Sequence, residues 1–173
     1  GPNTGGMGTY SDSDHSLPFL EKSQIESAQK INEATAKALK HKFGEGYKGI
    51  LYGGFIATNT GVQLIEYNAR FGDPEAMNIL SILDSDLIEI CEAIISEDLK
   101  NTKIVFKNLA TVCKYAVPEG YPDDPVKGHR IDASEVKNKN MLFYASVENK
   151  NDSLIQIGSR AIAIVGHGET IWE

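Results

Sequence analysis

The segment LIEYNARFGDPE, residues 64–75, contains an acid, an amide and a guanidinium at alternate positions of the chain. Successive side chains of a strand point to opposite faces, which predicts Glu66, Asn68 and Arg70 on one face, with about 7 Å between neighbours. Carboxylate and amide oxygens are hard ligands of the kind that Mg²⁺ takes, together with substrate phosphates and water. Arg70 offers a planar fork that binds a carboxylate or a phosphate. The pattern therefore indicates a surface that handles phosphate groups.

This strand is expected to lead directly into a helix. Asp73 has the side chain of an N-cap, and Pro74 suits the first helical position. The free amides of a helix N-terminus attract anions, which predicts a second anion site here. A solvated strand face that ends in an ordinary helix cap explains the same spacing, so both interpretations stay open. The other face of the strand carries Ile65, Tyr67, Ala69 and Phe71.

The opening residues, GPNTGGMG, form another candidate site. Glycines at positions 1, 5, 6 and 8 allow backbone N–H groups to come close to an anion. The loop is not a Walker A motif, because no Lys-Ser/Thr pair follows Gly6, and it lacks the GxGxxG spacing of a dinucleotide-binding loop. A plain flexible loop, extending to about residue 14, is the alternative.

Periodicity predicts the elements that must hold these residues. Apolar residues at helical spacing predict a helix from Ser23 to Phe43, with a capping box of Ser23 and Glu26 and a C-terminal Gly44. A turn at residues 59–61 joins two strands into a hairpin. The remaining elements of this first part are strands over 48–58 and 62–71 and helices over 73–80 and 86–96.

From about residue 108 the sequence becomes mainly β in character. Strands are expected over 108–117, 141–150 and 160–168, separated by turns rich in Pro, Gly and Asp, and a helix is expected to start at 168–170. The predicted fold class is α+β. The predicted domains are residues 1–105 and a small β-rich domain over 106–173 that is truncated at its end.

Composition excludes some classes of function. The 173 residues are 41% hydrophobic and 24% charged, with a net charge of -7 and no basic block, which argues against a general nucleic-acid or membrane-surface binder. No apolar run approaches the roughly 20 residues of a membrane span. Cys91 and Cys113 are predicted to be buried free thiols, consistent with a cytoplasmic setting.

Taken together, GPNTGGMG and the later IEYNARFGDPE closely resemble the glycinamide ribonucleotide synthetase family, the phosphoribosylamine–glycine ligases of the ATP-grasp superfamily. The stretches VPEGYPDDPVKG and RAIAIVGHGET are similar to the C-terminal region of that family, so the resemblance spans nearly the whole chain. It implies the C-terminal half of an ATP-grasp domain, an antiparallel sheet with helices, followed by a small β-rich C-terminal domain.

The resemblance implies a cytoplasmic carbon–nitrogen ligase of purine biosynthesis. ATP, the co-substrate, would phosphorylate the carboxylate of glycine, and the amine of 5-phosphoribosylamine would attack the resulting acyl phosphate. The products would be glycinamide ribonucleotide, ADP and phosphate. This chemistry depends on positioning and charge neutralisation. The cofactor would be Mg²⁺ or Mn²⁺, and no nucleic acid or membrane would be a partner.

The family pattern also implies roles for individual residues. Glu66 and Asn68 would hold the metal that bridges the ATP phosphates, and Arg70 would act in catalysis. Arg70 and residues 72–75 would face the reacting carboxylate and phosphate, and the first loop would line the phosphoribosylamine site. The implied substrate-binding residues are Pro2, Asn3, Thr4, Gly5, Gly6, Met7, Gly8, Arg70, Gly72, Asp73, Pro74 and Glu75.

Two departures from the superfamily pattern matter. Many ATP-grasp enzymes carry a further metal carboxylate about where Gly53 and Gly54 stand. The family enzymes are also roughly twice this length or more, and the N-terminal part with the glycine-rich lid has no counterpart here. That part is the implied partner, and this chain by itself is expected to be inactive. The alternatives are another ATP-grasp carboxylate–amine ligase and a non-catalytic binding module on the same scaffold.

Overall fold

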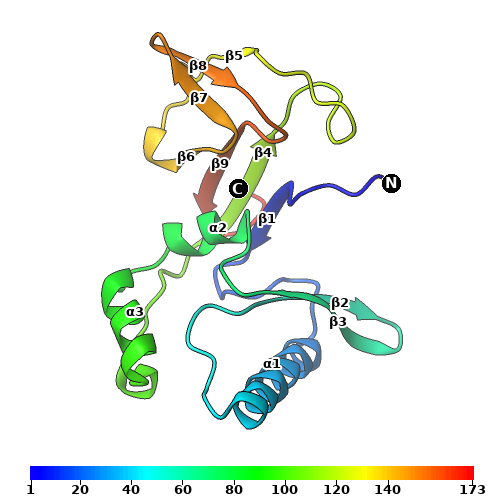
Figure 1. Cartoon of the computed structure of the whole chain (residues 1–173), viewed down its shortest axis with the longest axis vertical. Helices are drawn as coiled ribbons and strands as arrows, with labels where there is room; N and C mark the ends of the chain where they lie inside the picture. Colours follow the sequence, from blue (N-terminus) through cyan, green and yellow to red (C-terminus); the bar gives the residue numbers. More distant parts are fainter. The chain divides into compact units, whose positions relative to one another are not determined.

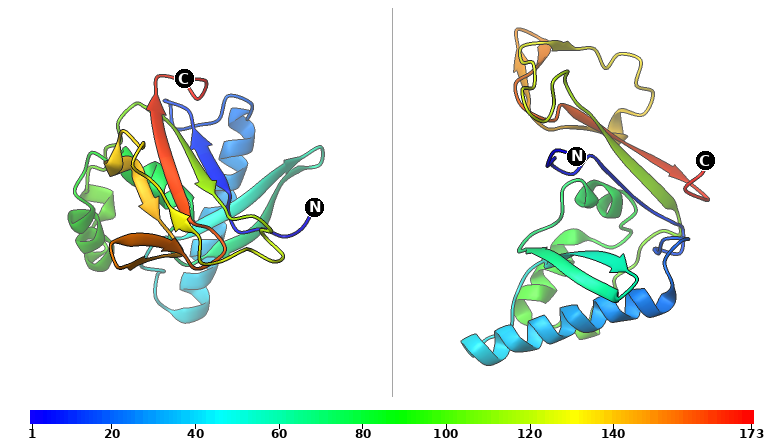
Figure 2. Two further views of the ribbon diagram at one scale, coloured as in Figure 1. Left: turned by 90° about the horizontal axis from the view of Figure 1, so that it is seen from above. Right: turned by 90° about the vertical axis from the view of Figure 1, so that its right-hand side faces the viewer.

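The computed structural model describes residues 1–173 and contains both helices and antiparallel sheets (Figure 1). Helix α1 (Lys22–Phe43) is the longest element, and the hairpin of β2 (Tyr52–Thr58) and β3 (Gly61–Asn68) lies along it (Figure 2). None of the helices combines the length and apolar character that crossing a membrane requires. The α+β fold class is confirmed.

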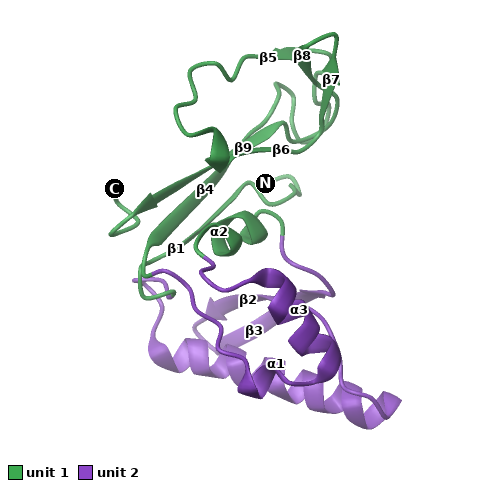
Figure 3. Cartoon of the chain, turned by 90° about the vertical axis from the view of Figure 1, so that its left-hand side faces the viewer, with its two compact units in different colours: residues 1–15, 73–82, 108–173 green, residues 16–72, 83–107 purple.

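The chain forms two compact units, coloured separately in Figure 3. Unit 1 comprises residues 1–15, 73–82 and 108–173, and unit 2 comprises residues 16–72 and 83–107. Each unit is assembled from stretches that are not contiguous in the sequence, because residues far apart along the chain pack together. The predicted domains, residues 1–105 and 106–173, are continuous segments of the sequence, and the two compact units do not test them. This division stays a prediction.

Helix α1 of unit 2 confirms the predicted helix but corrects its start. The capping box is formed by Glu21 and Gln24 instead of Ser23 and Glu26, and the Gln24 Oε1 accepts a hydrogen bond from the Glu21 N–H at 2.9 Å. Gly44 ends the helix as predicted. Its φ of 80° is left-handed, and its N–H donates to the Lys40 carbonyl at 2.9 Å.

The hairpin β2–β3 is held against α1 by a partly buried hydroxyl contact. The Tyr67 hydroxyl lies 2.9 Å from Asn32 Oδ1 and 3.1 Å from Thr35 Oγ1, both on α1. The predicted hairpin and its turn are confirmed. The strand β3 nevertheless ends at Asn68, so Ala69, Arg70 and Phe71 lie beyond it.

A β-bulge breaks the predicted alternation along β3. Gly54 pairs with Glu66 and Phe55 pairs with Leu64, which leaves Ile65 as the extra residue. Ile65 is 65% exposed, although strict alternation placed it on the apolar face with Tyr67. A bulge depends on the partner strand, and the sequence of β3 alone does not reveal it.

Helix α3 (Leu87–Ser96) and the short 3₁₀ helix η1 (Leu99–Asn101) complete unit 2. Asp86 caps α3, and its carboxylate accepts from the N–H groups of Ile88 and Glu89 at 2.7 and 3.3 Å. The predicted helix over 86–96 is confirmed. Cys91, however, is exposed, because the buried face of α3 is centred on Ile90 and Ala93.

Unit 1 is built on a four-stranded antiparallel sheet in the order β1-β4-β9-β6. Its strands are β1 (Gly8–Ser11), β4 (Ala110–Ala116), β9 (Ile162–Gly168) and β6 (Leu142–Tyr144). The prediction of a loop through residue 14 is wrong for β1. Glycine and serine are poor strand formers, but pairing with β4 satisfies the backbone of β1 and overrides that preference.

One face of this sheet carries the buried core of unit 1. Cys113 and Tyr115 of β4 lie with Ala163 and Val165 of β9, and Met77 of α2 (Glu75–Ser81) packs against them. Burial raises the pKa of the Cys113 thiol to about 11, helped by the negative charges of Asp73 and Glu75. The prediction of a buried thiol is therefore right for Cys113 and wrong for Cys91.

A second, three-stranded sheet in unit 1 has the order β5-β8-β7. It consists of β5 (Arg130–Ile131), β8 (Ser153–Gln156) and β7 (Val147–Lys150), and the 3₁₀ helix η2 (Lys139–Met141) precedes β6. The sequence predicted neither β5 nor β8, and the strand expected over 141–150 is divided between β6 and β7. Residues 168–170 do not start a helix; β9 continues to Gly168, and a bend and turn follow.

The two thiols should differ strongly in reactivity with an aromatic disulfide reagent at pH 8. Cys91 is exposed, whereas Cys113 is 1% exposed and has a raised pKa of about 11, so it presents little thiolate. We expect one fast thiol per chain, reacting roughly tenfold or more faster than the other. Cys91→Ser should abolish the fast phase and Cys113→Ser should retain it. Equal rates for both thiols in the folded protein would contradict this description.

Candidate functional site

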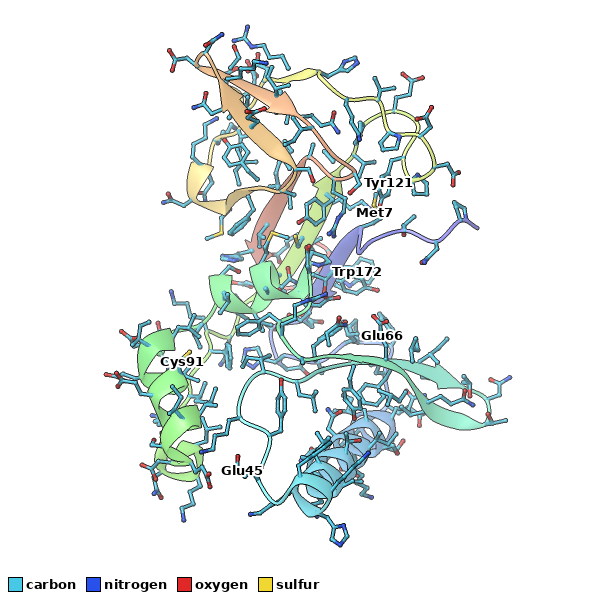
Figure 4. The ribbon with its side chains drawn as sticks, in the orientation of Figure 1. Met7, Glu45, Glu66, Cys91, Tyr121 and Trp172 are labelled. Carbon is cyan, nitrogen blue, oxygen red and sulfur yellow. The ribbon has the colours of Figure 1, made fainter.

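The acid and amide of the opening motif lie together on β3 of unit 2. The Asn68 side-chain Nδ2 donates to Glu66 Oε1 at 3.3 Å, so the two side chains project from one face of the strand as predicted. Figure 4 labels Glu66 on this strand. The exposed Glu66 carboxylate and the Asn68 amide oxygen are hard ligands, a donor set that fits Mg²⁺.

Gly54 of β2 lies directly across from Glu66. A Cβ at Gly54 would lie 3.7 Å from the Glu66 Cγ, an ordinary van der Waals distance, so space does not require glycine there. The partner strand therefore adds no carboxylate to the Glu66–Asn68 pair. No group of three or more His, Cys, Asp and Glu side chains suited to a metal occurs in the chain.

Arg70 lies in a different place from the one predicted. Since β3 ends at Asn68, Arg70 does not continue the strand face. Its Nη1 donates to the carbonyl of Phe71 at 2.7 Å, a contact that uses one of the five guanidinium N–H donors. The Arg70 side chain is exposed, and its hydrogen bond to the Phe71 carbonyl leaves the other guanidinium donors for a ligand or solvent.

Asp73, in unit 1, is not the N-cap of a helix. Helix α2 begins at Glu75 with Pro74 as its cap and is only seven residues long, so the predicted N-terminal anion site has no support. The Asp73 carboxylate is instead held by Arg160, with Nη2 2.7 Å from Oδ2 and Nη1 3.3 Å from Oδ1. The Asp73 carboxylate thus forms an ion pair with a residue far away in the sequence and does not cap the helix that follows it.

Tyr115 of β4 completes this arrangement. Its hydroxyl donates to Asp73 Oδ1 at 2.9 Å, and the Arg160 guanidinium lies over its ring at 4.6 Å from the centroid. Burial and the hydrogen bond to Asp73 raise the pKa of Tyr115 to about 12, so its hydroxyl stays a donor at neutral pH. We refer to Asp73, Tyr115 and Arg160 as the Asp73 cluster.

The glycine-rich loop meets the Asp73 cluster through its backbone. The carbonyl of Gly6 accepts from Arg160 Nη1 at 2.8 Å, and the N–H of Gly5 donates to the Tyr121 hydroxyl at 2.8 Å. Figure 4 shows Met7 and Tyr121 on neighbouring segments of unit 1. The loop is therefore anchored at two adjacent residues, through the N–H of Gly5 and the carbonyl of Gly6.

Close packing explains the glycine at position 6. A Cβ there would lie 2.4 Å from Pro74 Cδ and 2.5 Å from the Asp73 carbonyl oxygen. Gly8 meets a similar limit, because its Cβ would lie 2.8 Å from the Cys113 carbonyl oxygen. Both glycines allow one stretch of backbone to approach another.

The predicted site residues thus fall into two groups. Unit 2 holds Glu66, Asn68, Arg70 and Gly72, whereas the loop and the turn that follows Gly72 belong to unit 1. Within the loop, the Met7 carbonyl accepts from the Tyr115 N–H at 2.9 Å, and Gly8 starts β1. The remaining predicted residues are Pro2, Asn3 and Thr4, all exposed, and Pro74 and Glu75 at the start of α2.

Sequence reasoning assigned no role to Tyr115, Tyr121 or Arg160. Arg160 opens RAIAIVGHGET and Tyr121 lies in VPEGYPDDPVKG, two stretches that carry the family resemblance. The sequence signal for Arg160 is an arginine directly before an apolar strand, because a charge next to a buried strand needs a partner. The identity of that partner was not available, because Asp73 is 87 residues away.

Two family models match the chain. The model described as "Phosphoribosylglycinamide synthetase, ATP-grasp (A) domain" matches residues 1–76, and the one described as "Phosphoribosylglycinamide synthetase, C domain" matches residues 111–173. The phosphoribosylamine–glycine ligase of Methanocaldococcus jannaschii is 54% identical over 176 residues. The chain belongs to the phosphoribosylglycinamide synthetase family.

Other relatives agree with this membership. The phosphoribosylamine–glycine ligase of Methanosarcina barkeri is 47% identical over 171 residues, covering 99% of the chain and 39% of that relative. The crystal structure of the phosphoribosylamine–glycine ligase of Thermotoga maritima matches with a TM-score of 0.77 at 29% identity, covering 100% of the chain and 41% of the structure.

These similarities confirm the predicted family and the order of its parts, an ATP-grasp region followed by a β-rich C domain. The chain covers 39% of the length of the M. jannaschii relative and corresponds to a C-terminal portion of the synthetase. Unit 1 combines residues from both family models, since Asp73 lies in the first match and Arg160 in the second.

Replacing Gly6 with alanine should destabilise this synthetase chain. The added methyl group would overlap the Asp73 carbonyl and the Pro74 ring, so we expect the free energy of unfolding to fall by about 1–3 kcal/mol. Urea denaturation followed by circular dichroism measures it. Gly46→Ala is the matched control, because no atom lies within 4 Å of its Cβ and the change should stay within about 0.5 kcal/mol. Equal stability of the two variants would argue against the close approach at Gly6.

Proposed function

We propose that this chain forms part of an ATP-dependent ligase that joins glycine to 5-phosphoribosylamine in purine biosynthesis. The Glu66–Asn68 pair on β3 is the observation that carries the proposal, because it supplies the oxygen ligands of a nucleotide-bound cation in a chain of this family. The names of the relatives, all phosphoribosylamine–glycine ligases, support the same substrates.

The reaction would proceed in two balanced steps. A carboxylate oxygen of glycine attacks the γ-phosphorus of ATP, the bond to the β-phosphate oxygen breaks, and ADP leaves. The amine nitrogen of 5-phosphoribosylamine then attacks the acyl carbon of glycyl phosphate. The bond from that carbon to the phosphate oxygen breaks, phosphate leaves, and the nitrogen gives a proton to solvent. The protein contributes mainly by binding and orienting these groups.

Glu66 and Asn68 would hold a Mg²⁺ or Mn²⁺ ion together with the phosphates of ATP. Such an ion neutralises charge on the transferred phosphoryl group. The exposure of Glu66 suits this arrangement, because Mg²⁺ keeps water and substrate oxygens among its ligands. Gly54, opposite Glu66, leaves the protein with one carboxylate at this place.

The other predicted residues would bind the substrates. Arg70 has guanidinium donors beyond the one used by Phe71, and they would hold the reacting carboxylate or phosphate. The loop from Pro2 to Gly8 would line the site of 5-phosphoribosylamine. Gly72 and Glu75 would face the reacting groups, whereas the Asp73 carboxylate, already paired with Arg160, would fix the turn between them.

We assign residues 1–105 to the metal-bearing half of the ATP-grasp domain and residues 106–173 to the C domain. An ATP-grasp site encloses its nucleotide between two halves, so the remainder of the enzyme is the required partner. The proposed role in purine biosynthesis favours a cytoplasmic enzyme.

Changing Glu66 to glutamine in the complete enzyme should remove the one carboxylate of the metal site. We expect the turnover number to fall about 100-fold or more and the Mg²⁺ requirement to rise, since charge stabilisation of phosphoryl transfer is lost. Asn68→Ala should act in the same direction with a smaller loss. A coupled assay of ADP release at several Mg²⁺ concentrations measures both effects. Glu148→Gln, an exposed glutamate on β7, is the control, and unchanged Mg²⁺ dependence in both site variants would refute the assignment.

The 173-residue chain by itself should form no glycinamide ribonucleotide. It covers 39% of the M. jannaschii ligase, and an open metal face would leave the acyl phosphate exposed to hydrolysis. The purified chain can be assayed with ATP, Mg²⁺, glycine and 5-phosphoribosylamine after mass spectrometry has excluded contaminating ligase. Product at a rate near that of a complete enzyme would show that the other half is not needed.

A further inference from the structure

Three segments that are distant in the sequence meet at Arg160 in unit 1. They are the glycine-rich loop at Gly5 and Gly6, the turn at Asp73, and the part of the chain matched by the C-domain model. Arg160 lies just before β9 and contacts both of the other segments through its guanidinium group. One side chain therefore connects the two family regions inside a single compact unit.

The Arg160 side chain is only 18% exposed, and its contacts fix its orientation. Two guanidinium nitrogens bind the two oxygens of Asp73, and the Tyr115 ring lies against its face. The Tyr115 hydroxyl binds the same carboxylate. The Arg160 guanidinium is held along its edge by the Asp73 carboxylate and on its face by the Tyr115 ring, so it has little rotational freedom. Its Nη1 therefore has a fixed position for the hydrogen bond to the Gly6 carbonyl.

Tyr121 holds the other side of the loop. Its hydroxyl oxygen accepts from the Gly5 N–H, while Arg160 donates to the Gly6 carbonyl. A Cβ at Gly5 would lie 3.2 Å from Arg160 Nε and 3.4 Å from the Tyr121 hydroxyl, so glycine leaves room for both side chains. Residues Gly1 to Gly6 are exposed, so these two hydrogen bonds hold this part of the loop, and the next residue, Met7, is held through its carbonyl by the Tyr115 N–H.

Resting on the proposed function, we propose that Arg160 and Tyr121 are positioning residues for the amine substrate. They hold Gly5 and Gly6 in the conformation that accepts 5-phosphoribosylamine, so the C domain determines how well the ATP-grasp region binds that substrate. ATP and its cation depend on Glu66 and Asn68 in unit 2 and should be affected little. A purely structural pair of side chains would instead lower stability and affect all substrates alike.

The experiment uses the complete enzyme with Tyr121→Phe, Arg160→Gln and Arg160→Lys. Tyr121→Phe removes one hydroxyl and keeps the ring, and we expect the KM for 5-phosphoribosylamine to rise roughly fivefold, the effect of one neutral hydrogen bond. Arg160→Gln removes charge-assisted bonds and should raise that KM roughly tenfold or more. Arg160→Lys keeps the charge without the planar fork and should restore the KM only in part. The KM for ATP should stay within about twofold in all three variants, since no hydrogen bond from Tyr121 or Arg160 reaches unit 2.

Hydrogen exchange measured by mass spectrometry on peptides that contain residues 2–8 gives a readout that does not depend on the reaction. Exchange should become faster in Tyr121→Phe and Arg160→Gln, because the Gly5 N–H and the Gly6 carbonyl lose their partners. Tyr144→Phe and Arg130→Gln are matched controls at exposed positions, and neither should change exchange or KM. Tyr121→Phe also keeps the test valid where an Arg160 variant fails to fold.

Faster loop exchange together with a selective rise in the KM for 5-phosphoribosylamine would support the inference. Unchanged exchange in Tyr121→Phe, or equal losses for ATP, glycine and 5-phosphoribosylamine, would overturn it. A wild-type enzyme that makes no glycinamide ribonucleotide would overturn the proposed function instead, and the exchange measurement would still decide whether Arg160 and Tyr121 hold the loop.

Discussion

The ion pair between Asp73 and Arg160 is the interaction on which the rest of unit 1 depends. It joins the end of the LIEYNARFGDPE motif to Arg160, just before β9; the Arg160 side chain is 18% exposed, whereas the Asp73 side chain is 45% exposed. The largely shielded guanidinium of Arg160 is stabilised by this partner and by its further hydrogen bonds. The Tyr115 hydroxyl and the Gly6 carbonyl complete those bonds, so the pair also orders the neighbouring loop and turn.

Glycine makes this arrangement sterically possible. Gly6 lies so close to Asp73 and Pro74 that any side chain would overlap the Asp73 carbonyl and the Pro74 ring, and a Cβ at Gly8 would lie 2.8 Å from the Cys113 carbonyl oxygen of β4. Of the glycines that suggested an anion-binding loop, Gly6 and Gly8 are thus required first by packing between segments of the protein. Both explanations are compatible, because the same lack of side chains leaves backbone groups open to a substrate.

Unit 2 presents the opposite kind of organisation. Its candidate ligands, Glu66 and Asn68, are two residues apart on one strand, and the hairpin that carries them is fixed to α1 through Tyr67. The chemistry of the metal ligands therefore depends on local geometry, whereas the loop in unit 1 depends on contacts between residues far apart in sequence. The Glu66–Asn68 pair should therefore be sensitive to mutations in the hairpin and α1, whereas the loop should be sensitive to mutations at distant positions such as Tyr121 and Arg160.

The sequence by itself determined the features that local interactions control. Helix α1, the β2–β3 hairpin, helix α3 and the Glu66–Asn68 pair follow from periodicity, turn residues and a spacing of two, all of which act within a few residues. The family also followed from the sequence, because each of its two motifs, GPNTGGMG and IEYNARFGDPE, is a continuous run of residues.

Only the tertiary structure decided the remaining features. Strand β1 forms because β4 pairs with it, Ile65 is exposed because of a bulge opposite β2, and Cys91 lies outside the buried face of α3. Asp73, an aspartate directly before Pro74, was predicted to be an N-cap, but its carboxylate binds Arg160 and Tyr115 instead. A local cap and a distant ion pair compete for the same carboxylate, and the outcome depends on which donors the folded chain brings within hydrogen-bonding distance.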